Sequence, residues 1–240
     1  MAQVDPAVVE MPSSLAAGLM PPYARLAEWM SAEVAGLGDS ELDFCSTDPT
    51  REWMWWSIRR QVSHVAWDAL VFSHRRCAPL LWPDGNEPEP ISWRAAHLGP
   101  DATADRLLDE ARHHDLGELL DLFELGLSWL ERVVAEQPID ALRANVTSVR
   151  GTWFWQYVIQ VLPRGAGADP DRPGFIRYTL EASLWMVFYE VLAHIRTVQR
   201  LKAAQGLAAA VELPRVGYLR LPEYWGDADR NGPSFERLPT

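Results

Sequence analysis

Residues 182–195 read ASLWMVFYEVLAHI, an apolar run of helical length that contains two polar side chains able to carry charge at neutral pH, Glu190 and His194. The two stand at positions i and i+4 of the expected helix, so they share one face and lie one turn apart. A buried carboxylate without a partner is costly, so it pairs, shifts its pKa or binds a metal ion. We expect a helix over about 178–205, ended by Gly206, that buries this face.

A second helix is expected over about 52–76 and carries a similar polar pair. The segment VSHVAWDAL, residues 62–70, places His64 and Asp68 one turn apart among apolar neighbours. His64, Glu190 and His194 could together bind one divalent ion and leave a position open for water or substrate, as catalytic metal sites do. The alternative is that Glu190–His194 and His64–Asp68 are simple buried polar pairs. Asp68 could support His64, act as a base, or be a surface acid.

The rest of the chain predicts a mainly α-helical fold. Apolar residues recur at helical spacing over 15–37 and again over about 100–138, which with the two helices above predicts an antiparallel four-helix bundle with long connections. Residues 145–162 are rich in Val, Thr and aromatic side chains and favour a small β-hairpin, although a helix is the alternative. We expect a single domain over residues 1–240, with the bundle core at about 15–206 and an extended tail at 207–240.

Composition excludes several classes of function. Lys and Arg total 22 and Asp and Glu total 33, which gives a formal net charge of −11 and argues against nucleic acid or an anionic membrane as a partner. No apolar run is long enough to span a membrane, and the first residues, MAQVDPAVVEMPSS, do not resemble a signal peptide. Cys45 and Cys77 are too few for a disulfide framework or a four-cysteine zinc site. A cytoplasmic protein is therefore expected.

Tryptophan is unusually frequent, with 12 residues in 240. Rings near the polar positions could line a dry, apolar substrate pocket, for which the candidates are Trp56, Trp67, Trp185 and Tyr189. Core or interface packing is the alternative. The excess of ring surface also predicts a homodimer.

Two segments resemble the DinB/YfiT-like superfamily. Residues 36–72 (GLGDSELDFCSTDPTREWMWWSIRRQVSHVAWDALVF) are similar to the end of the first helix, the loop and the second helix of that family, and residues 188–206 (FYEVLAHIRTVQRLKAAQG) are similar to its fourth-helix signature. The resemblance covers about 15–75 and 178–206. The family's usual metal triad is three histidines, and Glu190 at the second position makes the set His64, Glu190 and His194 similar to that of the mycothiol-dependent maleylpyruvate isomerase branch.

The resemblance implies a DinB-like bundle that binds a divalent metal, most simply zinc, and uses a low-molecular-weight thiol as cosubstrate. The implied activity is that of a thiol S-transferase or isomerase acting on an electrophilic small molecule. Only 34 residues follow Gly206, so we expect no counterpart of the isomerase's appended domain. The residues alone are also compatible with two other functions. One is a metal-dependent hydrolase at the same site, and the other is a non-catalytic bundle that binds a small molecule or a partner chain.

Overall fold

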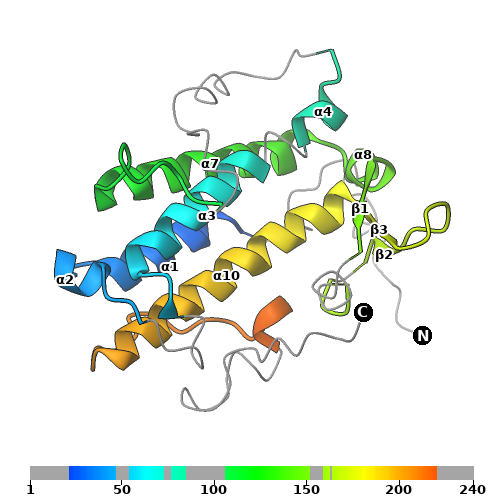
Figure 1. The fold of residues 1–240 in the computed structure, drawn as a ribbon. Coiled ribbons are helices and arrows are strands. Elements are labelled where there is room, and N and C mark those ends of the chain that lie inside the picture. The colour runs from blue at the N-terminus through cyan, green and yellow to red at the C-terminus, as the bar shows by residue number, and fades with distance from the viewer. Residues whose placement is uncertain are drawn as a thin grey trace, which may run out of the picture.

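The structure is a computed structural model that describes residues 22–46, 54–72, 77–84, 106–151, 159–162 and 164–220. It is mainly helical with a small antiparallel sheet, as expected (Figure 1). The elements are α1 (Ala24–Val34), α2 (Asp39–Leu42), α3 (Ile58–Phe72), α4 (Ala78–Leu81), α7 (Leu116–Glu136), α8 (Ile139–Ala144), β1 (Val146–Arg150), β2 (Ala166–Ala168), β3 (Phe175–Thr179), α10 (Leu180–Ala204) and the short 3₁₀ helix η5 (Gly217–Arg220).

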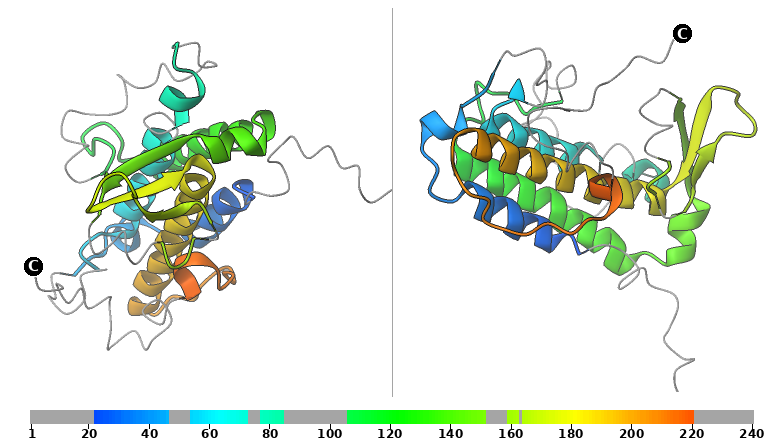
Figure 2. Two further views of the ribbon diagram at one scale, coloured as in Figure 1. Left: turned by 90° about the vertical axis from the view of Figure 1, so that its right-hand side faces the viewer. Right: turned by 90° about the horizontal axis from the view of Figure 1, so that it is seen from below.

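The long helices α1, α3, α7 and α10 enclose the core, and each of them packs against two of the others. Helix α3 contacts α7 and α10, and α1 also contacts α7 and α10 (Figure 2). Gly126 allows the close approach of α7 to α3, because a Cβ atom there would lie 2.7 Å from the Cβ of Ala69. The apolar faces of these helices merge into one buried cluster.

Helix α10 begins two residues later than the sequence suggests, because β3 leads directly into it. The hydroxyl of Thr179 caps the helix by accepting a hydrogen bond from the backbone of Ala182. The helix ends before Gly206, which has φ of +77°, a left-handed conformation that glycine adopts without strain. The apolar residues that flank the polar pair are fully buried, as expected: Val187, Val191, Val198 and Leu201.

The prediction of a helix that starts near residue 100 is wrong for residues 106–115, which form turns. Helix α7 starts only at Leu116, where the carboxylate of Asp115 accepts a hydrogen bond from the backbone of Glu118. Arg106 has φ of +55°, a left-handed backbone conformation that no α-helix contains. The short helix α2 lies in the connection between the two helices expected over 15–37 and about 52–76.

The sheet is confirmed, but its pairing differs from the expected hairpin. Strand β1 lies inside the predicted 145–162 segment, so residues 146–150 are not helical, but in the described residues it pairs with β3, with Val146 opposite Thr179. Strand β2 pairs with the other edge of β3, which gives the order β1-β3-β2. Strand β3 is therefore central, and its residues Ile176 and Tyr178 face the core. Residues 152–158 lie outside the described residues.

The chain after α10 is described as far as residue 220. It runs back along α10 to η5, where Tyr218 and Leu219 are buried against the helix. The remainder of the expected tail, 221–240, lies outside the described residues. Among the helices that the structure describes, none has the length and apolar character needed to cross a bilayer.

Candidate metal centre

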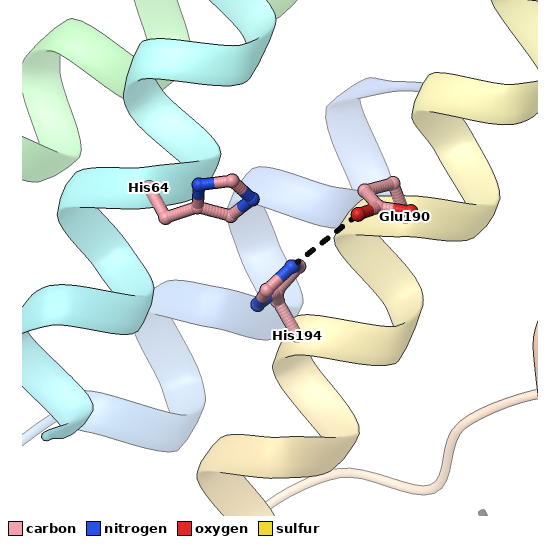
Figure 3. Close-up of side chains that lie close together, drawn as sticks. All are labelled: His64, Glu190 and His194. Carbon is pink, nitrogen blue, oxygen red and sulfur yellow. Dashed lines mark ion pairs between the residues drawn. The ribbon is translucent and has the colours of Figure 1, made fainter. Parts of the chain in front are cut away.

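Helices α3 and α10 bring together the three side chains singled out as metal ligands. His64 projects from α3, and Glu190 and His194 project from α10 toward it (Figure 3). One candidate ligand atom from each residue lies within 4.8 Å of the others. The two imidazole rings are 4.4 Å apart between centroids, and His194 Nε2 lies 3.7 Å from Glu190 Oε1. The trio therefore shares one small volume between the two helices.

The outer nitrogen of each imidazole has its own hydrogen bond. Nδ1–H of His64 donates to the backbone carbonyl of Arg106 at 2.7 Å, and Nδ1 of His194 lies 2.6 Å from Oε1 of Gln61, a buried side chain on α3. In a neutral ring with a proton on Nδ1, Nε2 carries a free lone pair. Nε2 of His64 is buried and has no hydrogen-bond partner in the part of the chain that the structure describes. Both lone pairs are thus available to a metal ion.

Burial determines the protonation of the cluster. Desolvation, with a smaller contribution from the neighbouring His194, lowers the pKa of His64 to about 4. Desolvation, together with the charge of Arg106, lowers the pKa of His194 to about 3. Desolvation raises the pKa of Glu190. Both imidazoles are therefore neutral at physiological pH, as metal ligands must be.

These low pKa values predict an acid-sensitive fold in the metal-free protein. Between pH 6.5 and about 4 the unfolded chain binds more protons at the two histidines than the folded chain does, so the free energy of unfolding falls as the pH falls. Each imidazole contributes up to about 1.4 kcal/mol per pH unit, and Glu190 opposes them because its pKa is raised.

The measurement is urea unfolding with a chelator present, from about pH 7 to about pH 4.5. The wild-type free energy of unfolding should depend more steeply on pH than that of His194→Gln. The exposed His114→Gln variant should match the wild type. Equal slopes in wild type and His194→Gln would show that the buried imidazole does not govern the pH dependence.

The other predicted site residues fall into two groups. The rings of Trp56 and Trp67 lie 5.1 and 6.3 Å from that of His64, so both border the cluster. Trp185 and Tyr189 pack against each other, and Tyr189 also contacts Tyr218 of η5. These two rings thus pack on α10, where η5 covers that of Tyr189.

Asp68 lies on α3 near His64, and its charge acts to raise the pKa of that histidine. The Nδ1 bond of His64, however, goes to the Arg106 carbonyl. Sequence reasoning missed both Arg106 and Gln61. Gln61 stands three residues before His64, on the same helix face, and this spacing was a usable signal.

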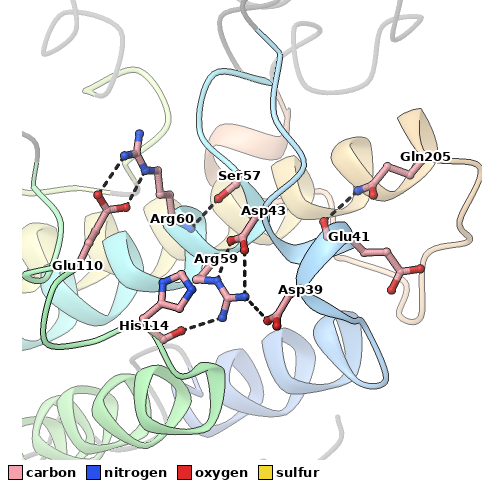
Figure 4. Close-up of polar contacts among 9 residues, drawn as sticks. All are labelled: Asp39, Glu41, Asp43, Ser57, Arg59, Arg60, Glu110, His114 and Gln205. Carbon is pink, nitrogen blue, oxygen red and sulfur yellow. Dashed lines mark hydrogen bonds and ion pairs between the residues drawn. The ribbon is translucent and has the colours of Figure 1, made fainter.

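The segment that carries Arg106 is fastened to α3 at several further points. The hydroxyl of Ser63 accepts a hydrogen bond from the backbone of Leu108, and Arg60 forms a bidentate pair with Glu110. The buried guanidinium of Arg59 donates to the backbone carbonyl of His114 and also pairs with Asp39 of α2 and with Asp43, which follows α2 (Figure 4). These contacts fix residues 106–114 over the helix that carries His64.

Comparison with known proteins gives no further guide to family or function. No protein-family model, no curated protein and no solved structure matches this chain. The three converging side chains and their surroundings are therefore the features that indicate a function.

Proposed function

We propose that the chain is a metal-dependent enzyme in which His64, Glu190 and His194 hold one divalent ion, most simply zinc. The observation that carries the proposal is the buried Nε2 lone pair of His64, which faces Glu190 and His194 and has no partner among the described residues. Two imidazole nitrogens and one carboxylate oxygen suit zinc and leave a position of its tetrahedron open. The hydrogen bonds at both Nδ1 atoms are of the kind that orients metal-binding histidines.

The fold proposal is an antiparallel four-helix bundle of the DinB/YfiT-like kind. The packing of α1, α3, α7 and α10 supports it, because each helix contacts two of the others around one core. The resemblance of residues 36–72 and 188–206 to that family supports the same proposal. In such a bundle, inward-facing side chains of neighbouring helices form the metal site.

The proposed reaction is transfer of a low-molecular-weight thiol to an electrophilic small molecule, or a thiol-dependent isomerisation. A divalent ion bound by the trio would lower the pKa of a coordinating thiol or water and so supply a nucleophile at neutral pH. The three side chains contribute one negative charge against the two positive charges of the ion, which favours an anionic fourth ligand such as a thiolate. His64 is fully buried beside the rings of Trp56 and Trp67, an apolar setting that favours thiol chemistry over hydrolysis.

The test is turnover by zinc-loaded protein of a model electrophile, such as an activated aryl halide, with and without mycothiol, bacillithiol or glutathione. We expect turnover above the uncatalysed rate with at least one thiol, none without a thiol, and loss of activity in His64→Ala. The exposed His114→Ala variant is the control and should retain activity. Equal turnover of a hydrolysable electrophile without thiol would indicate a hydrolase, and no turnover with any thiol would indicate a binding protein.

A further inference from the structure

The tautomer of His194 decides whether its Nε2 can bind a metal ion. A neutral imidazole carries one N–H, and the hydrogen bonds around the ring determine which nitrogen holds the proton. For His64 the backbone fixes the tautomer, because the carbonyl of Arg106 can only accept and therefore holds the proton on Nδ1. For His194 both neighbours of the ring nitrogens are side chains, so its tautomer depends on the residues at those positions.

Two side-chain oxygens compete for the single proton of His194. Oε1 of Gln61 lies 2.6 Å from Nδ1. Oε1 of Glu190 lies 3.7 Å from Nε2 (Figure 3). The first distance is that of a short hydrogen bond, and the second exceeds hydrogen-bond range. The proton therefore belongs on Nδ1, and Nε2 presents its lone pair to Glu190 and His64.

Gln61 reaches His194 from the facing helix. It lies on α3, three residues before His64, and is buried, with 3% of its surface exposed. Burial makes an unmade hydrogen bond costly, so the amide of Gln61 and the imidazole of His194 hold each other in place. The bond joins the helix that carries His64 to the helix that carries the other two candidate ligands.

The opposite tautomer would remove the candidate metal site. With its proton on Nε2, His194 would donate to the carboxylate of Glu190, one helical turn away, and the two would form a simple buried pair. The Nε2 lone pair would then be lost, and Glu190 would be engaged by the new hydrogen bond. The same three residues thus give a metal site or a structural pair, depending on one proton.

We propose that Gln61 is a positioning residue that holds the proton of His194 on Nδ1 and so keeps Nε2 free to bind a metal ion. Gln61 acts through His194 and makes no contact with the ion. Its neutral amide does this without adding charge, so the trio keeps the single negative charge of Glu190. The inference rests on the proposed metal site, although the tautomer itself is a property of the metal-free protein.

The first test reads the tautomer in metal-free protein, with a chelator present at neutral pH. Long-range ¹H–¹⁵N correlation spectra of protein labelled at histidine distinguish a proton on Nδ1 from one on Nε2, and comparison with His194→Gln assigns the signals. We expect the proton on Nδ1 of His194 in the wild type. In Gln61→Met, which replaces the amide by an apolar side chain of similar length, we expect it on Nε2.

The second test measures zinc affinity by chelator competition. Gln61→Met should bind zinc roughly 10- to 100-fold more weakly than the wild type, as expected when the partner of a metal-binding histidine is lost. Gln61→Glu keeps an acceptor for Nδ1–H and should restore both the wild-type tautomer and the affinity. The matched control is Gln199→Met. Gln199 is a buried glutamine whose amide binds Glu33, so its loss should change neither the tautomer nor zinc affinity.

The outcomes separate this inference from the proposed function. A wild-type proton on Nε2 of His194, or on both nitrogens, overturns the inference, as does a Gln61→Met variant with the wild-type tautomer or the wild-type zinc affinity. If the tautomer changes as expected but the wild type does not bind zinc, the proposed function fails and the control of the tautomer by Gln61 stands. If Gln61→Met does not fold, Gln61→Asn takes its place, because its amide is one methylene too short to reach His194.

Discussion

Alanine at Glu190 is expected to weaken zinc binding by at least about 100-fold while the protein remains folded. Glu190 supplies the one negative charge among the three candidate ligands, so its loss removes both a donor atom and the charge that matches the ion. Its contact with His194 is long, at 3.7 Å, so no short charge-assisted hydrogen bond is lost. Desolvation raises the pKa of Glu190, so burial disfavours its charged form. A free energy of unfolding within about 1 kcal/mol of the wild type is therefore expected for the metal-free variant.

Competition with a chromophoric chelator measures the zinc affinity, and the matched control is Glu181→Ala. Glu181 is a buried glutamate of the same helix, paired with Arg143 at 2.9 Å. Its removal should destabilise the fold and leave zinc affinity unchanged, the reverse of Glu190→Ala. If Glu190→Ala instead holds zinc at full occupancy, or loses about 3–5 kcal/mol of stability, then Glu190 forms a structural pair with His194 and is not a metal ligand.

Alanine at Glu33 is expected to cost about 3–5 kcal/mol of folding free energy, the largest stability effect that the structure predicts. Glu33 lies in α1 and is fully buried. Its carboxylate accepts hydrogen bonds from Lys202 at 2.7 Å, from Gln199 at 2.8 Å, and from the backbones of Ala210 and Val211. Burial acts to raise the pKa of Glu33, and these hydrogen bonds outweigh it, so the pKa is lowered. Without the carboxylate, the buried ammonium of Lys202 keeps one acceptor among the described residues, the carbonyl of Glu33.

Urea unfolding at neutral pH measures the loss, and Glu28→Ala is the control. Glu28 lies in the same helix and pairs with Arg25 on the surface, so its removal should change stability by no more than about 0.5 kcal/mol. The double variant Glu33→Ala, Lys202→Met should be more stable than Glu33→Ala alone, because it removes the uncompensated charge. A loss for Glu33→Ala that is as small as that of Glu28→Ala would show that the network does not hold α1 to α10.

The sequence was sufficient to predict the two helices that carry the trio, although α3 begins at Ile58 and not near residue 52 as expected. Apolar spacing in 62–70 and 182–195 defines a buried face, and His64, Glu190 and His194 interrupt it, so their convergence follows once the two faces pack. Predicting the convergence of the trio therefore required only the local periodicity of the two helices and the packing of one against the other.

The surroundings of the trio could not be predicted in the same way. The left-handed conformation of Arg106 and its bond to His64 lie in residues 106–115, where apolar spacing predicted a helix that the structure does not have. The pairing of β1 with β3 joins residues far apart in the chain, and no local pattern encodes it. The pair His113-His114 is typical of an exposed, charged face, yet His113 is buried with Nδ1 2.9 Å from Glu118. Tertiary contacts decide each of these features.

The central claim, that His64, Glu190 and His194 bind one metal ion, is tested most directly by anomalous X-ray diffraction at the zinc absorption edge from crystals of the zinc-loaded protein. The account predicts one anomalous peak per chain between α3 and α10, at roughly 2.0–2.2 Å from Nε2 of His64, Nε2 of His194 and a carboxylate oxygen of Glu190. No peak at this position, or a peak bound to other residues while the three side chains hydrogen-bond among themselves, would contradict it.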